Sequence, residues 1–189
     1  DRSMRIISGN FKGKKIFLPK DKKTRPLRDL VKESIFNLIE HSKKFSFSIN
    51  NSKILDLFSG TGSFGLECIS RGAQKVFFIE NYNEALDILK KNTSTLDLEE
   101  KFEIFKENCF NFSNVKKILN EKFDLIFIDP PFKEIKINKI IETIKDKQIL
   151  SKKGIIIIHR HIKDDIKITE KLKILDERNY GISKIIIGS

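Results

Sequence analysis

Residues 53–65 read KILDLFSGTGSFG, a stretch that fixes the interpretation of the rest of the chain. Its first five residues are mostly apolar and are typical of a buried strand. Three glycines follow, at Gly60, Gly62 and Gly65. Glycines at this point permit a tight turn and let backbone N–H groups approach a ligand at the carboxyl end of the strand. The stretch therefore predicts a strand, a ligand-binding loop and a helix in succession.

Two acidic residues accompany the loop. Asp56 precedes Gly60 by four residues, and Glu80 ends the next apolar run, twenty residues after Gly60. An acid at the end of the second strand can accept hydrogen bonds from both ribose hydroxyls, as in sites for adenosine-containing cofactors generally. NAD therefore stays open on these residues alone. Asp56 favours S-adenosylmethionine, because an acid beside the loop suits a cationic methionine ammonium and would repel a pyrophosphate.

From residue 53 onward, apolar runs alternate with helical patterns, which predicts a parallel sheet covered on both faces. The expected strands are residues 53–58, 76–80, 102–105, 123–129 and 154–159, and the expected helices are 63–71, 82–93, 110–120 and 137–147. Runs at 172–177 and 183–187, separated by Asn179-Tyr180-Gly181, favour a final antiparallel hairpin. This order resembles the α/β class I S-adenosylmethionine-dependent methyltransferase fold, which is Rossmann-like with a seven-stranded, mostly parallel sheet and a C-terminal antiparallel hairpin.

The first 52 residues differ in charge from the rest of the chain. They carry 13 Lys and Arg against 5 Asp and Glu, whereas residues 53–189 carry 24 against 21. This excess favours a nucleic-acid partner, because phosphate neutralisation supplies most non-specific affinity. Apolar runs at 5–7 and 15–18 predict a small β-hairpin, and apolar spacing predicts a helix over 27–41. We expect an RNA-facing extension over residues 1–52 and a catalytic domain over residues 53–189.

A second motif follows the apolar run at residues 123–128, where the chain continues as Asp129-Pro130-Pro131-Phe132. In this kind of sheet the fourth strand lies beside the first, so the tetrad should face the glycine loop. An aromatic amine is a poor nucleophile, because its lone pair is delocalised into the ring. Asp129 and the Pro130 carbonyl can accept its two N–H bonds and orient the nitrogen, while Phe132 can stack on an extruded base.

Other classes of site find little support. Cys68 and Cys109 are far apart and belong to no Cys-x-x-Cys pair, so neither a disulfide nor a metal site is expected. The triplet His159-Arg160-His161 is given no metal-binding or catalytic role, because adjacent strand residues point to opposite faces. No apolar run approaches the length of about 18 residues that a membrane span needs, and no signal peptide is recognisable, so we expect a cytoplasmic protein.

Motifs over nearly the whole chain resemble the bacterial 16S rRNA (guanine(966)-N(2))-methyltransferase family, the small-subunit ribosomal RNA methyltransferases D. The glycine loop and the tetrad are shared with many amino-methyltransferases, whereas the N-terminal motifs are more specific. Those N-terminal motifs are Met4-Arg5-Ile6-Ile7-Ser8-Gly9, Gly13-Lys14-Lys15, Arg25-Pro26 through Asp29, and Lys32-Glu33-Ser34-Ile35-Phe36-Asn37. The chain departs from the family at Leu27-Arg28, where a Thr pair is usual, and at His159, where a Glu is usual.

The resemblance implies methyl transfer from S-adenosylmethionine to the exocyclic N2 of a guanine in 16S ribosomal RNA, within a small-subunit ribonucleoprotein particle, by a monomer without a metal. It implies methionine binding by Asp56, Gly60 and Gly62, ribose binding by Glu80, and adenine contacts near Asn108 and Cys109. Phe58, Thr61 and Asn81 complete the expected cofactor site. Asp129, Pro130 and Phe132 would engage the guanine, and the RNA would meet Arg5, Lys12, Lys14, Lys15, Arg25 and Arg28.

Other readings stay open at this point. Adenine N6 and cytosine N4 are also exocyclic amines, so the tetrad alone does not select guanine N2. An NAD-dependent oxidoreductase would explain the glycines and Glu80 but would leave the tetrad without a role. A non-catalytic RNA-binding protein would explain the basic extension but would leave the glycine loop without a role.

Overall fold

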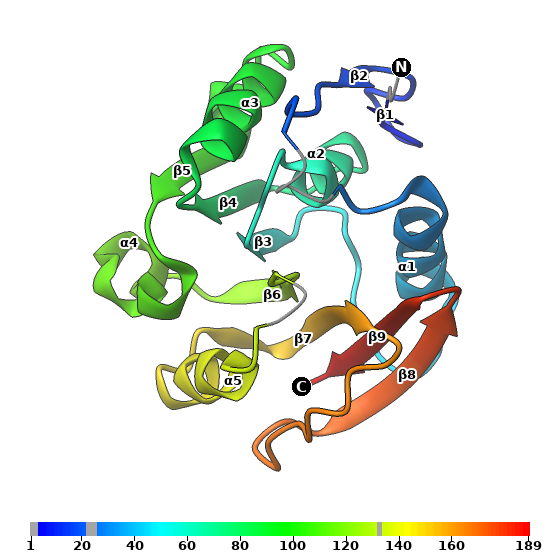
Figure 1. Ribbon diagram of the computed structural model, residues 1–189, viewed down its shortest axis with the longest axis vertical. Coiled ribbons are helices and arrows are strands. Elements are labelled where there is room, and N and C mark those ends of the chain that lie inside the picture. Colours follow the sequence, from blue (N-terminus) through cyan, green and yellow to red (C-terminus); the bar gives the residue numbers. More distant parts are fainter. Residues whose placement is uncertain (1–3, 22–25, 132–133) are drawn as a thin grey trace.

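Seven strands form the central sheet in the computed structural model, which describes residues 4–21, 26–131 and 134–189 (Figure 1). Within that described part, β3, β4, β5, β6 and β7 are parallel, and β9 runs antiparallel to both β7 and β8. This arrangement confirms the predicted sheet and its C-terminal hairpin. In spatial order the strands are β5 (Phe102–Lys106), β4 (Lys75–Glu80), β3 (Lys53–Leu57), β6 (Phe123–Ile128), β7 (Leu150–His161), β9 (Ser183–Gly188) and β8 (Ile174–Tyr180).

Helices cover both faces of the sheet (Figure 1). One face packs against α1 (Asp29–His41), α2 (Ser63–Ser70) and α3 (Asn83–Ser94), and the other against α4 (Lys116–Leu119) and α5 (Ile137–Asp146). Successive strand residues alternate between the two cores, because side chains of a strand point to opposite faces. None of the helices in the described ranges is long and apolar enough to cross a membrane.

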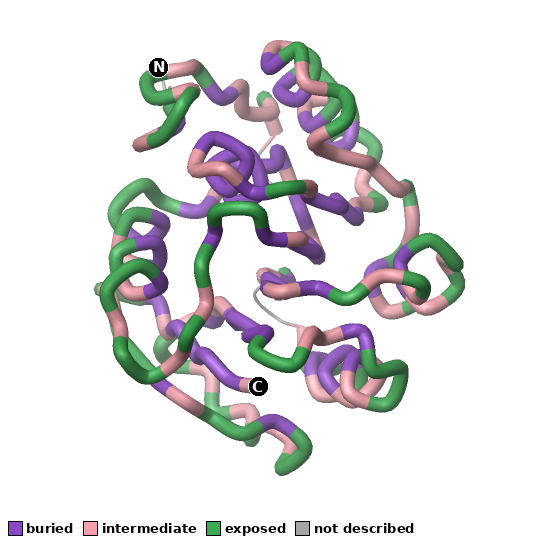
Figure 2. Tube along the Cα trace, turned by 180° about the vertical axis from the view of Figure 1, so that it is seen from behind, coloured by how far each residue is buried: buried purple, intermediate pink, exposed green. Residues whose placement is uncertain are grey.

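The N-terminal hairpin is confirmed, since β1 (Met4–Arg5) pairs antiparallel with β2 (Lys15–Ile16). The hairpin and α1 pack over α2, whose eight residues are all buried (Figure 2). Met4, Ile6 and Ile16 belong to the same apolar core as the sheet. The basic extension therefore adds a structural layer to the fold besides any contact with a partner.

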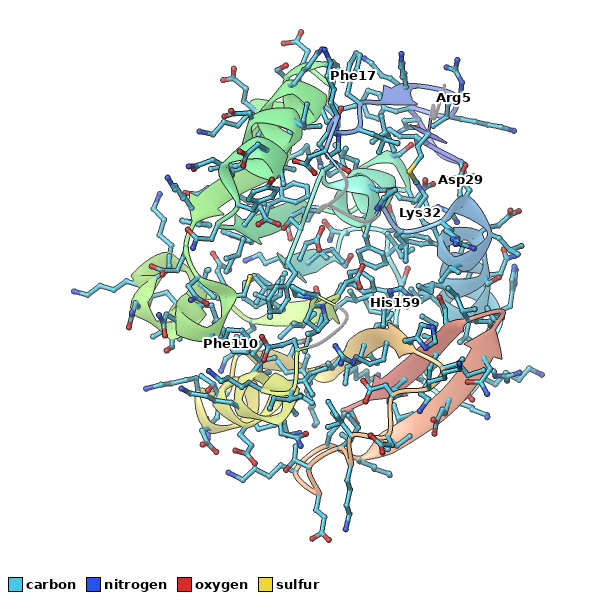
Figure 3. All side chains as sticks on the ribbon, in the orientation of Figure 1. Arg5, Phe17, Asp29, Lys32, Phe110 and His159 are labelled. Carbon is cyan, nitrogen blue, oxygen red and sulfur yellow. The ribbon has the colours of Figure 1, made fainter. Side chains whose placement is uncertain are left out.

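A buried ion cluster joins the hairpin, α1 and α2. The Glu67 carboxylate, fully buried in α2, accepts hydrogen bonds from the backbone N–H groups of Ile7 (2.8 Å) and Ser8 (3.0 Å). It also pairs with Arg71 at 2.9 Å and with Lys32 at 3.3 Å. Lys32 projects from α1 (Figure 3), and burial lowers the pKa of its ammonium while Glu67 opposes that shift. One carboxylate thus satisfies groups from three separate segments.

Most expected elements agree with the structure to within a few residues, but one helix is wrong. The segment expected as a single helix over residues 110–120 is a 3-10 helix, η2 (Cys109–Asn114), followed by the short α4. Asn108 caps η2 by accepting the Phe110 N–H at 2.9 Å, and Val115 is extended, which interrupts the helix. Asn and Ser side chains compete with helical backbone bonds, and this segment contains several of them. A second 3-10 helix, η1 (Glu99–Lys101), was not expected.

Candidate active site

The loop between β3 and α2 adopts a tight left-handed path. Phe58, Gly60 and Gly62 have φ angles of 58°, 56° and 88°. The positive φ at Gly62 favours glycine, and a Cβ added there would lie 2.5 Å from Leu89 Cδ1, so the Leu89 side chain would have to shift. Phe58 adopts the strained region without being glycine, a feature that clusters at ligand sites. The sequence-predicted glycine turn is confirmed in its conformation.

Glu80 binds the same loop from the neighbouring strand. One of its carboxylate oxygens accepts the Gly60 N–H at 2.8 Å, and the other accepts the N–H groups of Asn81 (2.8 Å) and Tyr82 (2.9 Å). Glu80 therefore lies against the glycine loop, and its hydrogen bond with Gly60 was not predicted from the sequence. A carboxylate has about four acceptor positions, so Glu80 keeps capacity for a hydroxyl donor such as a ribose.

Asp56 lies deeper, one strand residue before Leu57, and is almost fully buried. One of its oxygens accepts the Gly65 N–H at 3.2 Å. Burial raises the pKa of Asp56 well above its usual range, and the neighbouring carboxylates of Asp129 and Glu80 raise that pKa further. A cation placed among these three acids would be attracted, whereas a pyrophosphate would be repelled.

The Asp129 tetrad lies beside the loop, as expected. Leu57 of β3 pairs with Ile128 of β6, so Asp129 follows directly at the carboxyl edge. Pro130 is buried and Pro131 is exposed; the Pro131 carbonyl accepts the Glu134 N–H at 2.9 Å. Phe132, predicted to stack on the target base, lies outside the described residues.

Asn108 and Cys109, the residues expected near the adenine, form hydrogen bonds to other groups of the protein. The Asn108 side chain is the cap of η2, and the buried Cys109 Sγ accepts the Phe58 N–H at 3.1 Å. Burial raises the pKa of the Cys109 thiol, which keeps it protonated. The rings of Phe58 and Phe110 meet edge to face with centroids 5.7 Å apart and supply apolar surface here.

The other two expected cofactor residues differ in exposure. Thr61 is buried, and its carbonyl accepts the Asn92 side-chain amide at 2.8 Å, whereas Asn81 is exposed beside Glu80. Within the described part of the chain, no three or more His, Cys, Asp or Glu side chains are grouped as a metal site would require.

Sequence reasoning missed His159. Its Nδ1 lies 2.8 Å from Asp129 Oδ1, and its Nε2 lies 2.8 Å from Ser183 Oγ. The alternation of strand side chains correctly separates His159 from Arg160, but it says nothing about neighbouring strands. The signal that could have found this contact is the strand register. Ile128 of β6 pairs with Ile158 of β7, so the residues that follow them, Asp129 and His159, lie side by side.

The expected RNA-facing residues divide into two groups. Lys12 and Lys15 are exposed on the hairpin, whereas the Lys14 ammonium donates to the Thr95 carbonyl. The hairpin also binds Ser70 at the C-terminal end of α2. The exposed Arg5 side chain donates to the Gly13 carbonyl at 2.9 Å.

Arg28 lies near the opposite end of α2. It is exposed and precedes α1 by one residue, close to Lys32, whose ammonium donates to Ser63 at the first residue of α2. An eight-residue helix is roughly 12 Å long, so Arg28 lies nearer the carboxyl edge of the sheet than the hairpin turn does. Arg25 lies outside the described residues.

Comparisons with known proteins extend over nearly the whole chain. The family described as "Conserved hypothetical protein 95" matches residues 4–189. A Buchnera aphidicola protein named "Ribosomal RNA small subunit methyltransferase D" is 34% identical over 85% of this chain and 80% of its own length. A Haemophilus influenzae protein of the same name is 32% identical over 95% of this chain and 90% of its own length.

Solved structures agree with the observed architecture. A Haemophilus influenzae structure, provisionally described as a methylase, is 30% identical with a TM-score of 0.74 and covers 99% of this chain and 98% of its own. An Escherichia coli structure, provisionally described as a methyltransferase, has a TM-score of 0.81, covers 99% of this chain and 97% of its own, and at 24% identity supports the fold alone.

Proposed function

We infer the function of this chain from its family: it belongs to the family described as "Conserved hypothetical protein 95" and is a relative of the ribosomal RNA small subunit methyltransferases D. We propose that it methylates the exocyclic N2 of a guanine in small-subunit ribosomal RNA. The methyl donor is S-adenosylmethionine. We propose that the protein acts as a monomer on RNA within an assembling particle. The choice of guanine N2 over adenine N6 or cytosine N4 rests on the N-terminal motifs, which are the most specific part of the resemblance.

One observation carries the proposal: three acids surround the glycine loop. Glu80 accepts the Gly60 N–H, Asp56 accepts the Gly65 N–H, and Asp129 follows directly after the β6 residue that pairs with Leu57. This negative site suits the cationic ammonium and sulfonium of S-adenosylmethionine, and it disfavours NAD, whose pyrophosphate would add negative charge. Glu80 would accept a ribose hydroxyl, Asp56 would attract the methionine ammonium, and Phe58 and Phe110 would border the adenine.

The chain's own residues orient the amine. Its nitrogen would form a bond to the methyl carbon of the donor as the carbon–sulfur bond breaks, sulfur would keep the electron pair, and the nitrogen would then release one proton to solvent water. Asp129 would accept one N–H of the amine and the Pro130 carbonyl the other, so the lone pair is turned toward the methyl group. Alignment of this kind is a large part of catalysis when the nucleophile is weak.

Replacing Glu80 by alanine should weaken binding of S-adenosylhomocysteine by about 1.5–3 kcal/mol, because a charge-assisted contact to ribose is lost. Isothermal calorimetry on the wild-type protein and the variant measures this directly, with NADH titrated in parallel. The wild-type protein should bind S-adenosylhomocysteine and not NADH.

Thermal melting of the same variant is the necessary control, since Glu80 also accepts the Gly60, Asn81 and Tyr82 N–H groups. Glu84→Ala, an exposed acid in the first turn of α3, is a matched variant that should bind normally. Unchanged affinity for S-adenosylhomocysteine in Glu80→Ala would remove Glu80 from the cofactor site, and tight binding of NADH would overturn the cofactor class.

The hairpin lysines test the predicted RNA face. Replacing Lys12 and Lys15 by alanine should lower affinity for single-stranded RNA, and each lost phosphate contact should reduce the slope of log affinity against log salt by about 0.7. Lys14 is left intact because it also donates to Thr95. Affinity for S-adenosylhomocysteine should not change, because its expected site lies elsewhere.

Two exposed lysines on β7, Lys152 and Lys153, provide a matched control with the same change in charge. Their double alanine variant should keep the wild-type salt slope. If the Lys12 and Lys15 variant also keeps it, RNA does not meet this face. The pair Lys20 and Arg28 would then be the next to replace.

A further inference from the structure

Three polar side chains form a continuous hydrogen-bonded row at the carboxyl edge of the sheet. Ser183 Oγ lies 2.8 Å from His159 Nε2, and His159 Nδ1 lies 2.8 Å from Asp129 Oδ1. The residues come from β9, from β7 and from the position after β6, which are neighbouring strands. Figure 3 shows His159 between the sheet and α1.

With Asp129 ionised and the His159 ring neutral, the chemistry of the partners sets the direction of both bonds. An ionised carboxylate only accepts, so Asp129 requires a hydrogen on His159 Nδ1. In the neutral ring, Nε2 then carries the lone pair and accepts from the Ser183 hydroxyl. Ser183 therefore donates to His159, and His159 donates to Asp129. Each group in the row has a partner that holds its orientation.

Strand pairing and burial fix the positions of His159 and Ser183. His159 pairs with Ile185 across the β7 and β9 ladder, and Ser183 is buried. Arg160, the next residue, is also buried and donates to the Glu134 carbonyl at 2.8 Å and to the Pro131 carbonyl at 3.4 Å. The end of β7 thus contacts the tetrad loop with two consecutive side chains that leave the strand in opposite directions.

The hydrogen bond between His159 and Asp129 also opposes the repulsion between the carboxylates of Asp129 and Asp56. Asp129 is close enough to the buried Asp56 to raise the pKa of that residue, so the two carboxylates repel each other. A carboxylate near a like charge tends to become protonated or to turn away. The hydrogen bond with His159 Nδ1 keeps one oxygen of Asp129 in place against this repulsion.

We propose that His159, supported by Ser183, is a positioning residue that holds Oδ1 of Asp129 and thereby presents Oδ2 to the amine that is methylated. This inference rests on the proposed function. His159 forms and breaks no bond in the transfer. Its effect is on the alignment of Asp129.

Steady-state methylation of small-subunit RNA by three variants tests this role. His159→Ala should lower kcat by about 10- to 100-fold, since a misplacement of about 1 Å can cost 10²-fold, while the KM for S-adenosylmethionine stays within about threefold. His159→Asn, whose side-chain amide N–H can occupy the place of Nδ1–H, should recover most of that loss. Ser183→Ala should have a smaller effect in the same direction, because it removes only the support.

His41→Ala, which removes an exposed histidine at the far end of α1, is the matched control and should retain wild-type kcat. Full activity of His159→Ala would overturn the positioning role. Equal loss in His159→Ala and His159→Asn would also overturn it, because the donated N–H would then be irrelevant. A wild-type protein that methylates no ribosomal RNA is a different result, which overturns the proposed function.

Nitrogen-15 NMR of the histidine ring gives a readout that does not depend on RNA or on folding of a variant. In the wild-type protein the neutral His159 ring should carry its proton on Nδ1. A neutral ring protonated on Nε2 would contradict the direction of both hydrogen bonds and would overturn the proposal.

Discussion

Replacing Asp129 by alanine should lower the rate of methyl transfer by about 10²–10³, because an oriented acceptor for the target amine is lost. The structure places this carboxylate at the carboxyl edge between the glycine loop and β7, with one oxygen held by His159. Single-turnover methylation with saturating donor measures the effect on the chemical step. Affinity for S-adenosylhomocysteine should stay within a few-fold, since the partner of Asp129 is the amine.

Asp165→Ala removes an exposed acid and should behave as the wild-type protein. The comparison with Glu80→Ala separates the two expected roles: Asp129 should affect turnover, whereas Glu80 should affect cofactor binding. Near-normal methylation by Asp129→Ala would contradict its assignment to the reaction.

Replacing Glu67 by alanine should destabilise the fold by about 3–5 kcal/mol, because the buried Lys32 ammonium loses its carboxylate partner and Arg71 keeps its ion pair with the more exposed Glu40 alone. The N–H groups of Ile7 and Ser8 also lose their acceptor. For a chain of this size, the melting temperature should fall by roughly 6–20 °C. Differential scanning calorimetry measures the change.

The exposed pair of Lys171 and Asp146 is the matched control. Asp146→Asn should change stability by less than about 1 kcal/mol, because exposed ion pairs contribute little. A melting temperature for Glu67→Ala that equals the wild-type value would contradict the structural role of the cluster.

The buried Lys32 ammonium makes the stability of the fold depend on pH. Its pKa is lowered from 10.5 in the folded protein by burial, so the unfolded chain binds more protons in the window between the lowered value and 10.5. Stability should therefore rise with pH across that window. In Glu67→Ala the attraction that opposes the shift is absent, so the window should widen toward lower pH.

The sheet and the centre of the site could be predicted because their signals are local. Apolar runs predicted the strands, glycines predicted the turn, and the position of Glu80 at the end of the second strand predicted that it lies near the glycine loop. Leu57 pairs with Ile128, which brings Asp129 beside the loop as the fold class implies. Strand order and parallel register convert these local signals into a three-dimensional site.

The rest depends on contacts between distant segments. The contact between His159 and Asp129 joins residues thirty positions apart, and Glu67 accepts from backbone groups about sixty positions away. No periodic pattern of apolar residues in the sequence indicates such contacts. The helix expected over 110–120 failed for a local reason, since apolar spacing was satisfied while Asn108 and Val115 favoured a broken path.

The most direct test of the proposed function is mass spectrometry of nucleosides from small-subunit ribosomal RNA after incubation with the purified protein and S-adenosylmethionine. The RNA should come from a strain that lacks this enzyme, as naked RNA and as particles in parallel. We predict a single new product, N2-methylguanosine, that is absent when the Asp129→Ala variant is used. New N6-methyladenosine or N4-methylcytidine would contradict the assigned amine. The absence of any new methylated nucleoside in both substrates would contradict the function itself.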